Sequence, residues 1–128
     1  MLTGLVFSLL LVGGVFSRWL NRGAEADADQ QVLNQLREAG SNLVKPHDVE
    51  FFLYFPTEQS ANAAALELRN EGVEVEVKMA ADSSAWLCAA TKRMVPEHGE
   101  LSRLRITFNA IAKKFDGEYD GWGTGVVN

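Results

Sequence analysis

The residues of this chain that could do chemistry lie close together near its C-terminal end. Three carboxylates and two aromatic rings occur in one short stretch: Asp116, Glu118, Tyr119, Asp120 and Trp122. The carboxylates could ligate a hard cation, but the segment lacks the other oxygen ligands of a calcium loop. Each aromatic ring combines a large apolar area with a polar edge. Packing inside the protein and anchoring of a partner both fit this pattern.

The remaining nucleophilic and titratable side chains are too scattered for a catalytic or metal site. Cys88, the only cysteine, lies in an apolar run without a basic neighbour, so we expect a buried thiol. His47 and His98 lie far apart and are expected at the surface, because a metal site needs more ligands. The sequence contains no phosphate-binding glycine loop and no Gly-x-Ser-x-Gly elbow. We therefore expect a protein without enzymatic activity, metal or cofactor.

Charge is distributed unevenly along the 128 residues. Of the 12 basic residues, Arg18 and Arg22 precede position 23, so residues 23–128 hold 10 basic and all 17 acidic residues, a net charge of −7. An acidic surface repels phosphate backbones, which argues against direct binding of nucleic acid. The charge favours a basic surface on another protein as the partner, or it simply keeps the domain soluble.

The N-terminal segment is strongly apolar. Leu2–Ser17 contains no charged residue, and its length of about 16 residues comes close to the ~17–25 that a spanning helix needs. Arg18 can snorkel and Trp19 suits the headgroup layer, which extends the segment to residues 2–20. A cleaved signal peptide is the alternative, but it would carry its positive charge before the apolar stretch. We therefore predict a single-pass anchor in the inner membrane within residues 1–22, with the domain in the cytoplasm.

The rest of the chain has the periodicity of one α+β domain over residues 30–128, preceded by a linker over 23–29. In chain order we expect a helix at 30–39, a strand at 48–55, a helix at 60–71, strands at 73–79 and 85–94, a helix at 97–114 and a short strand at 118–122. Asp29 is the expected cap of the first helix. After that helix, the order β-α-β-β-α-β predicts a ferredoxin-like sandwich with helices on one face of an antiparallel sheet.

The other face of this sheet would carry Phe52 and Tyr54, which alternate with Phe51 and Leu53. Exposed aromatic side chains on such a sheet can stack RNA bases when the surroundings are basic. Here the neighbours Glu50, Glu74 and Glu76 are acidic, so a protein partner is favoured over RNA. We favour over both kinds of binding the simpler possibility that the N-terminal helix covers Phe52 and Tyr54.

The C-terminal stretch resembles the signature of a known family. The run Lys114-Phe115-Asp116, then Glu118-Tyr119-Asp120-Gly121-Trp122-Gly123-Thr124, is similar to the C-terminal motif of the RraB family, regulators of ribonuclease E activity. The expected layout over about residues 29–125 also resembles that family, with an N-terminal helix before β-α-β-β-α-β. Two features depart from its familiar members, which are soluble and more acidic.

The resemblance implies a non-catalytic protein that binds the non-catalytic region of ribonuclease E and thereby modulates RNA turnover without contacting RNA. It implies that the partner-binding residues are Asp116, Glu118 and Asp120, with Tyr119 or Trp122 as an anchor. Taken without the resemblance, the residues also fit a membrane-anchored ligand-sensing domain or a small enzyme.

Overall fold

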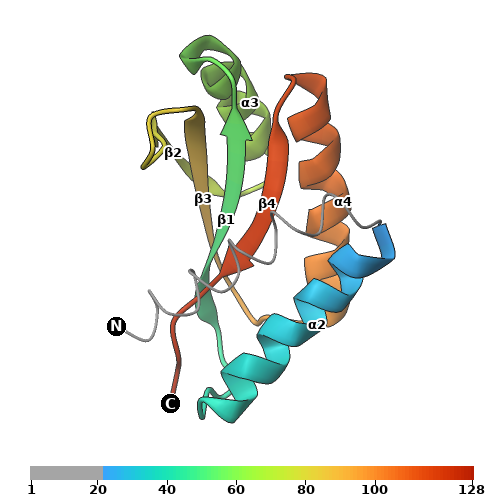
Figure 1. The fold of residues 1–128 in the computed structure, drawn as a ribbon. Coiled ribbons are helices and arrows are strands. Elements are labelled where there is room, and N and C mark those ends of the chain that lie inside the picture. The colour runs from blue at the N-terminus through green and yellow to red at the C-terminus, as the bar shows by residue number, and fades with distance from the viewer. Residues whose placement is uncertain (1–21) are drawn as a thin grey trace.

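The computed structural model describes residues 22–128, so the anchor predicted over residues 2–20 lies outside the described residues. In chain order the elements are α2 (Arg22–Glu38), β1 (His47–Phe55), α3 (Glu58–Asn70), β2 (Glu74–Met79), β3 (Trp86–Met94), α4 (His98–Lys114) and β4 (Glu118–Gly123) (Figure 1). From β1 onward each predicted element is confirmed, and its ends differ by no more than two residues from the prediction. Among the described residues, no helix combines the length and the apolar character that crossing a membrane requires.

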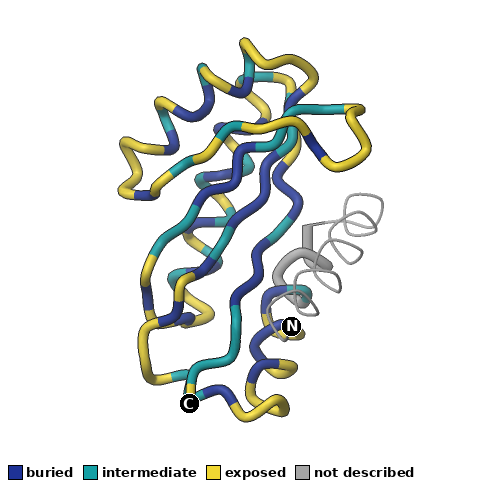
Figure 2. The backbone as a smooth tube through the Cα atoms, turned by 90° about the vertical axis from the view of Figure 1, so that its left-hand side faces the viewer, coloured by how far each residue is buried: buried dark blue, intermediate teal, exposed yellow. Residues whose placement is uncertain are grey.

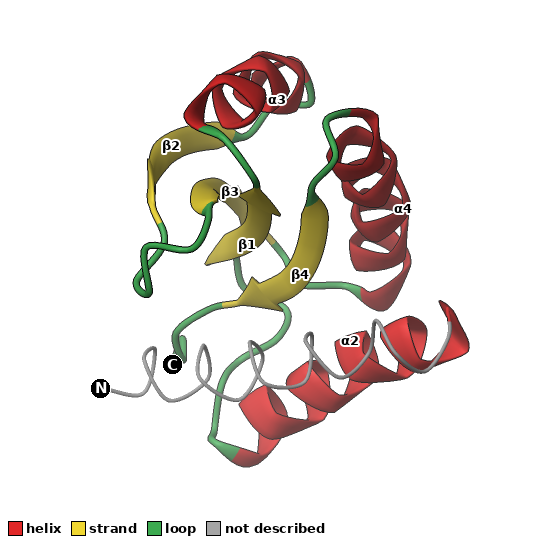
Figure 3. Ribbon diagram, turned by 45° about the horizontal axis from the view of Figure 1, so that its top comes forward, coloured by secondary structure: helices red, strands yellow, loops and turns green. Residues whose placement is uncertain are grey.

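The four strands form one antiparallel sheet in the order β2-β3-β1-β4. Helices α3 and α4 lie on the same side of it, and α2 lies beside α4 and β4 (Figure 3). The fold is therefore α+β, and its strand order is compatible with the predicted ferredoxin-like sandwich. Because α2 lies against α4 and β4 and not against β1, the predicted cover of Phe52 and Tyr54 by this helix is wrong.

Helix α2 begins at Arg22, several residues before the predicted start, and the segment 23–29 is helical. The prediction of a linker was wrong because it gave too little weight to the alternating alanines at 24, 26 and 28, since alanine is the strongest helix former. Asp29 is consequently an interior residue of the helix and not its cap. It is 4% exposed and faces the rest of the domain.

Helix α3 shows how local chemistry fixes an element between two strands. Thr57 precedes it in an extended conformation, and a reciprocal capping box joins Thr57 to Ser60. Its buried face consists of Ala61, Ala64, Ala65 and Leu68. The three alanines have little side-chain volume, so the helix can lie close to the sheet. The Cys88 thiol on β3 donates to the Ala61 carbonyl at 3.2 Å.

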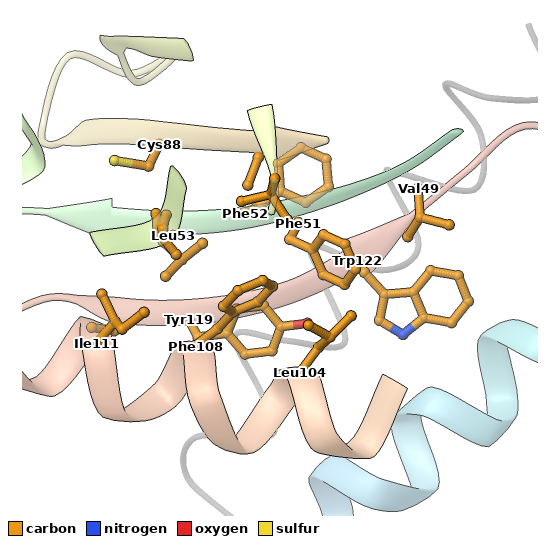
Figure 4. Packing of buried hydrophobic residues seen from close by; sticks show 14 of the residues in the cluster. Val49, Phe51, Phe52, Leu53, Cys88, Leu104, Phe108, Ile111, Tyr119 and Trp122 are labelled. Carbon is orange, nitrogen blue, oxygen red and sulfur yellow. The ribbon is translucent and has the colours of Figure 1, made fainter. Parts of the chain in front are cut away.

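The hydrophobic core lies between the sheet and the helices, and the central strand β1 is buried along most of its length (Figure 2). Aromatic rings gather at its centre (Figure 4): the centroids of Phe51 and Phe108 are 5.0 Å apart edge to face, and those of Phe108 and Tyr119 are 5.9 Å apart. Cys88 is fully buried, as predicted, and this burial raises the pKa of its thiol to about 11.

Candidate protein-binding surface

The C-terminal segment leaves α4 through a turn that requires unusual backbone geometry. Asp116 has a positive φ of 61°, a conformation that aspartate tolerates better than most residues. At Gly117, a Cβ would lie 2.5 Å from the Tyr54 carbonyl oxygen and would overlap the Phe55 ring. Glycine at this position therefore lets the chain pass directly against β1 as it begins β4.

Two aromatic residues of β4 then point into the core. Tyr119 pairs with Leu53 and Trp122 pairs with Phe51 in the ladder with β1. Trp122 is 1% exposed and Tyr119 is 8% exposed. Both rings lie on the helix-covered side of the sheet, with the indole nitrogen directed towards α2 (Figure 4).

A buried polar cluster connects Trp122 to two helices. The Trp122 indole N–H donates to Asp29 Oδ1 at 3.0 Å, and Arg105 Nε on α4 donates to Asp29 Oδ2 at 3.1 Å. Burial raises the pKa of the Asp29 carboxyl, although its bonds to Arg105 and Trp122 act in the opposite direction. This carboxylate fastens α2 to both β4 and α4.

Asp120 lies between these two aromatic residues, where the ladder is irregular. The register between β1 and β4 shifts between Phe51 and Leu53, and Gly121 has a φ of 100°. Such an irregularity is a β-bulge, which re-aims neighbouring side chains. Asp120 is only 6% exposed. The pKa of Tyr54 is raised chiefly by its own burial and secondarily by the negative charge of Asp120.

The five residues predicted as a site therefore divide into two groups. Asp116 and Glu118 are exposed. Tyr119, Asp120 and Trp122 are buried. Of the two roles expected for Tyr119 and Trp122, packing inside the protein therefore applies to both side chains. The accessible residues of the signature, Asp116 and Glu118, are acidic.

The face of the sheet away from α3 and α4 brings further acidic residues together. Side chains alternate along each strand, and the registers place those of this open face in rows across the sheet. The first row is Glu74, Thr91 and Glu50; the second is Glu76, Ala89 and Phe52; the third is Lys78, Leu87, Tyr54 and Glu118. Acidic side chains are therefore concentrated towards β2 and at Glu118, around an apolar centre.

A groove of about 550 Å³ lies at the first row. Its lining includes the carboxylates of Asp48, Glu50 and Glu74, the hydroxyl-bearing Thr91, and residues 124–127 of the C-terminal tail. Partial burial raises the pKa of Glu50, whose charge is also repelled by Glu76 and attracted by Lys78. In the part of the chain that the structure describes, no group of three or more His, Cys, Asp or Glu side chains is placed to hold a metal ion.

The tail that forms one wall of this groove is fixed by hydrogen bonds. Thr124 Oγ1 donates to the Asp48 carbonyl at 2.8 Å. The Val127 N–H donates to Ser41 Oγ at 2.9 Å, and the Val127 carbonyl accepts the Asn42 N–H at 2.6 Å. These hydrogen bonds hold residues 124–127 in place as one wall of the groove.

His47 was predicted at the surface, and this prediction is wrong, since its side chain is fully buried. Its Nδ1 lies 2.8 Å from the Lys45 carbonyl and its Nε2 lies 2.6 Å from Ser41 Oγ. A carbonyl only accepts, so Nδ1 carries a proton, and in a neutral ring Nε2 then accepts from Ser41 Oγ, which also lies 3.4 Å from the Val127 carbonyl oxygen. A serine–histidine pair could serve as nucleophile and base, but Ser41 already accepts the Val127 N–H and the pair is enclosed. Its geometry supports a structural role. His98 is exposed, as predicted.

Sequence reasoning found the acidic residues of the open face but not their assembly. The sequence marked Glu50, Glu74 and Glu76 as acidic neighbours of Phe52 and Tyr54, and Asp48 carried no signal of its own. Only the pairing of β1 with β3, and of β3 with β2, brings Asp48, Glu50 and Glu74 to one groove. The sequence signal that could have indicated this groove is the repeated occurrence of acidic residues at alternate positions of two strands.

Comparison with known proteins gives one family. A comparison with curated proteins finds no match. The family model described as regulator of ribonuclease activity B matches residues 26–124, well over half of the 128 residues. The matched range contains most of α2, every strand, both sheet-covering helices and the signature segment. The chain belongs to the RraB family, the regulators of ribonuclease activity B.

Proposed function

We propose that this chain is a non-catalytic regulator that binds a ribonuclease through the open face of its sheet. The observation that carries the proposal is the row arrangement: acidic side chains of β1, β2 and β4 lie around Tyr54 and Leu87, which are partly exposed, while Phe52 and Ala89 of the same rows are buried. Such a surface is complementary to a partner segment that is basic and carries some apolar side chains.

A protein partner suits this surface better than RNA. The affinity of proteins for RNA rests on neutralising phosphates with basic side chains. On the open face the basic residues Lys78 and Arg93 already face acids, since Lys78 Nζ lies 3.6 Å from Glu76 and Arg93 lies 3.2 Å from Asp48. We propose that the partner is the basic non-catalytic region of ribonuclease E, and that no direct contact with nucleic acid is made.

The residues of the signature would act in two ways. Asp116 and Glu118, which remain accessible, would contact the partner at the β4 end of the surface. Tyr119, Asp120 and Trp122, which are buried, would hold β4 in the position from which the accessible acids project. The groove acids Glu50 and Glu74 extend the proposed site beyond the signature.

The test is capture of the non-catalytic region of ribonuclease E by the purified full chain. We expect Glu50→Gln combined with Glu74→Gln to weaken capture severalfold, because two carboxylates of the groove lose their charge. A matched control is Glu58→Gln combined with Glu97→Gln, which removes the same charge near the starts of α3 and α4. Equal losses in the two double variants would show that net charge acts without a specific site. Absence of capture by the unchanged chain would contradict the proposed partner.

The alternative is a small enzyme or a ligand-sensing domain. The purified chain should leave RNA intact by itself and should change the rate at which ribonuclease E cleaves it. Cleavage of RNA by the chain alone, abolished by changing one polar residue, would instead establish the enzyme.

The membrane anchor predicted from residues 2–20 adds a location to the proposal, namely the inner membrane with the domain in the cytoplasm. A reporter that is active only in the cytoplasm, fused after Asn128, should then be active and should sediment with membranes. A mature protein that begins near Asp27 and is found in the periplasm would contradict this location.

A further inference from the structure

The two edges of the sheet differ in how they are covered. At the β4 edge, α2 lies alongside the strand and Trp122 is bonded to Asp29 of that helix. At the other edge, β2 pairs with β3 on one side, and within residues 22–128 no strand pairs with its other side. An uncovered edge is a template for pairing with another strand.

The outward-facing backbone groups of β2 can be identified. Ala80 N–H donates to the Ala85 carbonyl in continuation of the ladder with β3, so even-numbered residues of β2 turn their backbone groups towards β3. The backbone groups of Val75, Val77 and Met79 therefore point away from the sheet. Consistent with this, the Val75 carbonyl accepts a hydrogen bond from Arg69 Nη2 at 3.0 Å. A carbonyl has two lone pairs, so this bond leaves room for a second donor.

The side chains of β2 are complementary to themselves when the strand is reversed. An antiparallel pairing centred on Val77 would place Glu76 opposite Lys78 of a second copy, and Lys78 opposite its Glu76. A centre one residue earlier would place Glu76 opposite Glu76, between two Glu74–Lys78 pairs, and a centre one residue later would place Lys78 opposite Lys78. Among these three registers, only the one centred on Val77 has no like-charge pair within β2. Like charges directly opposite each other destabilise a sheet and opposite charges stabilise it. Charge therefore selects the register centred on Val77.

The other face of β2 agrees with this register. In the register centred on Val77, the Val77 side chain lies opposite Val77 of the second copy, and Val75 lies opposite its Met79. Val75 and Val77 are only partly buried, and Met79 is 51% exposed. Pairing would cover all three with apolar neighbours, and each outward-facing residue would exchange two backbone hydrogen bonds with its opposite residue.

We propose that a second copy of this chain docks on β2, in an antiparallel pairing centred on Val77, and so joins two sheets into one. The pairing has two-fold symmetry, so the same surface serves both copies. Because the strand has six residues, the interface is small and the association depends on protein concentration. The paired backbone edge of β2 differs from the groove of the first row, but the side chains of Glu76 and Lys78 also lie on the open face.

A charge exchange tests the register. The full chain should show a mass in sedimentation equilibrium that rises towards that of a dimer as its concentration increases. Glu76→Lys alone and Lys78→Glu alone should each weaken self-association about tenfold, because two attractive pairs become repulsive. A mixture of these two variants should associate again, since one copy then carries lysine at both positions and the other carries glutamate at both. Charge changes at Glu58 and Glu97, which do not belong to β2, should leave association unchanged.

A cross-link tests the same register by a different property. In a Cys88→Ala background, needed because Cys88 lies opposite Val77 on β3, Val77→Cys should form a disulfide-linked dimer on mild oxidation. Directly opposite residues of a hydrogen-bonded pair have Cα atoms about 5.5 Å apart, within disulfide range. Val75→Cys in that background should not cross-link to itself but should cross-link to Met79→Cys. A monomer at every concentration, or a mixture of charge variants that stays monomeric, would overturn the proposal.

Discussion

Trp122 links three elements that lie far apart in the sequence. Its ring fills the core beside Phe51 on β1, and its N–H reaches Asp29 on α2, whose carboxylate also holds Arg105 on α4. A buried carboxylate with good hydrogen-bond partners is stabilising only while these partners stay in place. At the residue scale, the signature tryptophan is therefore a connector of the fold.

Two substitutions at Trp122 separate packing from hydrogen bonding. Trp122→Phe keeps an aromatic ring but removes the donor to Asp29, and should lower the free energy of unfolding by about 1–3 kcal/mol. Trp122→Ala also removes most of the buried ring and should cost about 3–5 kcal/mol. Denaturant unfolding measures both. If the Phe variant were as stable as the unchanged chain, the bond to Asp29 would contribute nothing.

Asp29 gives a prediction on pH. Burial raises the pKa of this carboxyl in the folded state, so between its ordinary value of 3.8 and its raised value the folded state binds more protons than the unfolded state. Stability contributed by Asp29 must then decrease as pH rises through this window, and must stay constant above it. The stability difference between the unchanged chain and Asp29→Asn, measured by unfolding at several pH values, should follow this course. A difference that grows with rising pH would show that Arg105 outweighs burial.

At the scale of elements, the position of β4 depends on the turn that follows α4. The chain must pass close to Tyr54 and Phe55, and it can do so because position 117 has no side chain. The following bulge then directs Tyr119 and Trp122 inward while Asp120 lies between them on the other side. One short segment thereby supplies both core residues and an acidic surface.

Glycine substitutions test this turn against a matched site in the preceding helix. Gly117→Ala should destabilise the protein by about 1–3 kcal/mol, because the added methyl group overlaps the backbone and ring of β1. Gly99→Ala, in the first turn of α4, places its methyl group 3.6 Å from the Glu97 side chain, which is ordinary contact. It should be neutral or mildly stabilising, since alanine favours helices. Thermal unfolding measures the stability of both variants. A Gly117→Ala variant as stable as the unchanged chain would contradict the described path of β4.

At the scale of the whole molecule, the two faces of the sheet differ in character. One face packs against α3 and α4 and accounts for stability, while the open face gathers carboxylates from three strands. The described domain carries a strong excess of acidic residues, so its long-range field attracts basic partners before any contact forms.

This field predicts a dependence on salt. Capture of the basic region of ribonuclease E should weaken as ionic strength rises from low to physiological values, since the Debye length falls to about 8 Å. The Glu50→Gln and Glu74→Gln double variant should show a shallower decrease than the unchanged chain. Titrations at several salt concentrations measure both slopes. Binding that is insensitive to salt would place the contact on apolar residues.

The sequence by itself determined the order of strands and helices, because their periodicities of two and of three to four residues follow from local backbone geometry. It also indicated the acidic character and, through the signature, the family. It failed for residues 23–29, where alanine-rich composition was taken for a linker, and for His47, whose burial depends on Ser41 and Lys45 around it.

Only the tertiary structure decided which residues of the signature face solvent. Tyr119 and Trp122 have side chains that suit either a core or an interface, and the choice depends on the bulge in β4 and on Asp29 and Arg105, which are distant in sequence. The same holds for the groove, whose carboxylates come from different strands. Strand pairing brings such residues together over long sequence separations, so no local pattern specifies the surface that they form.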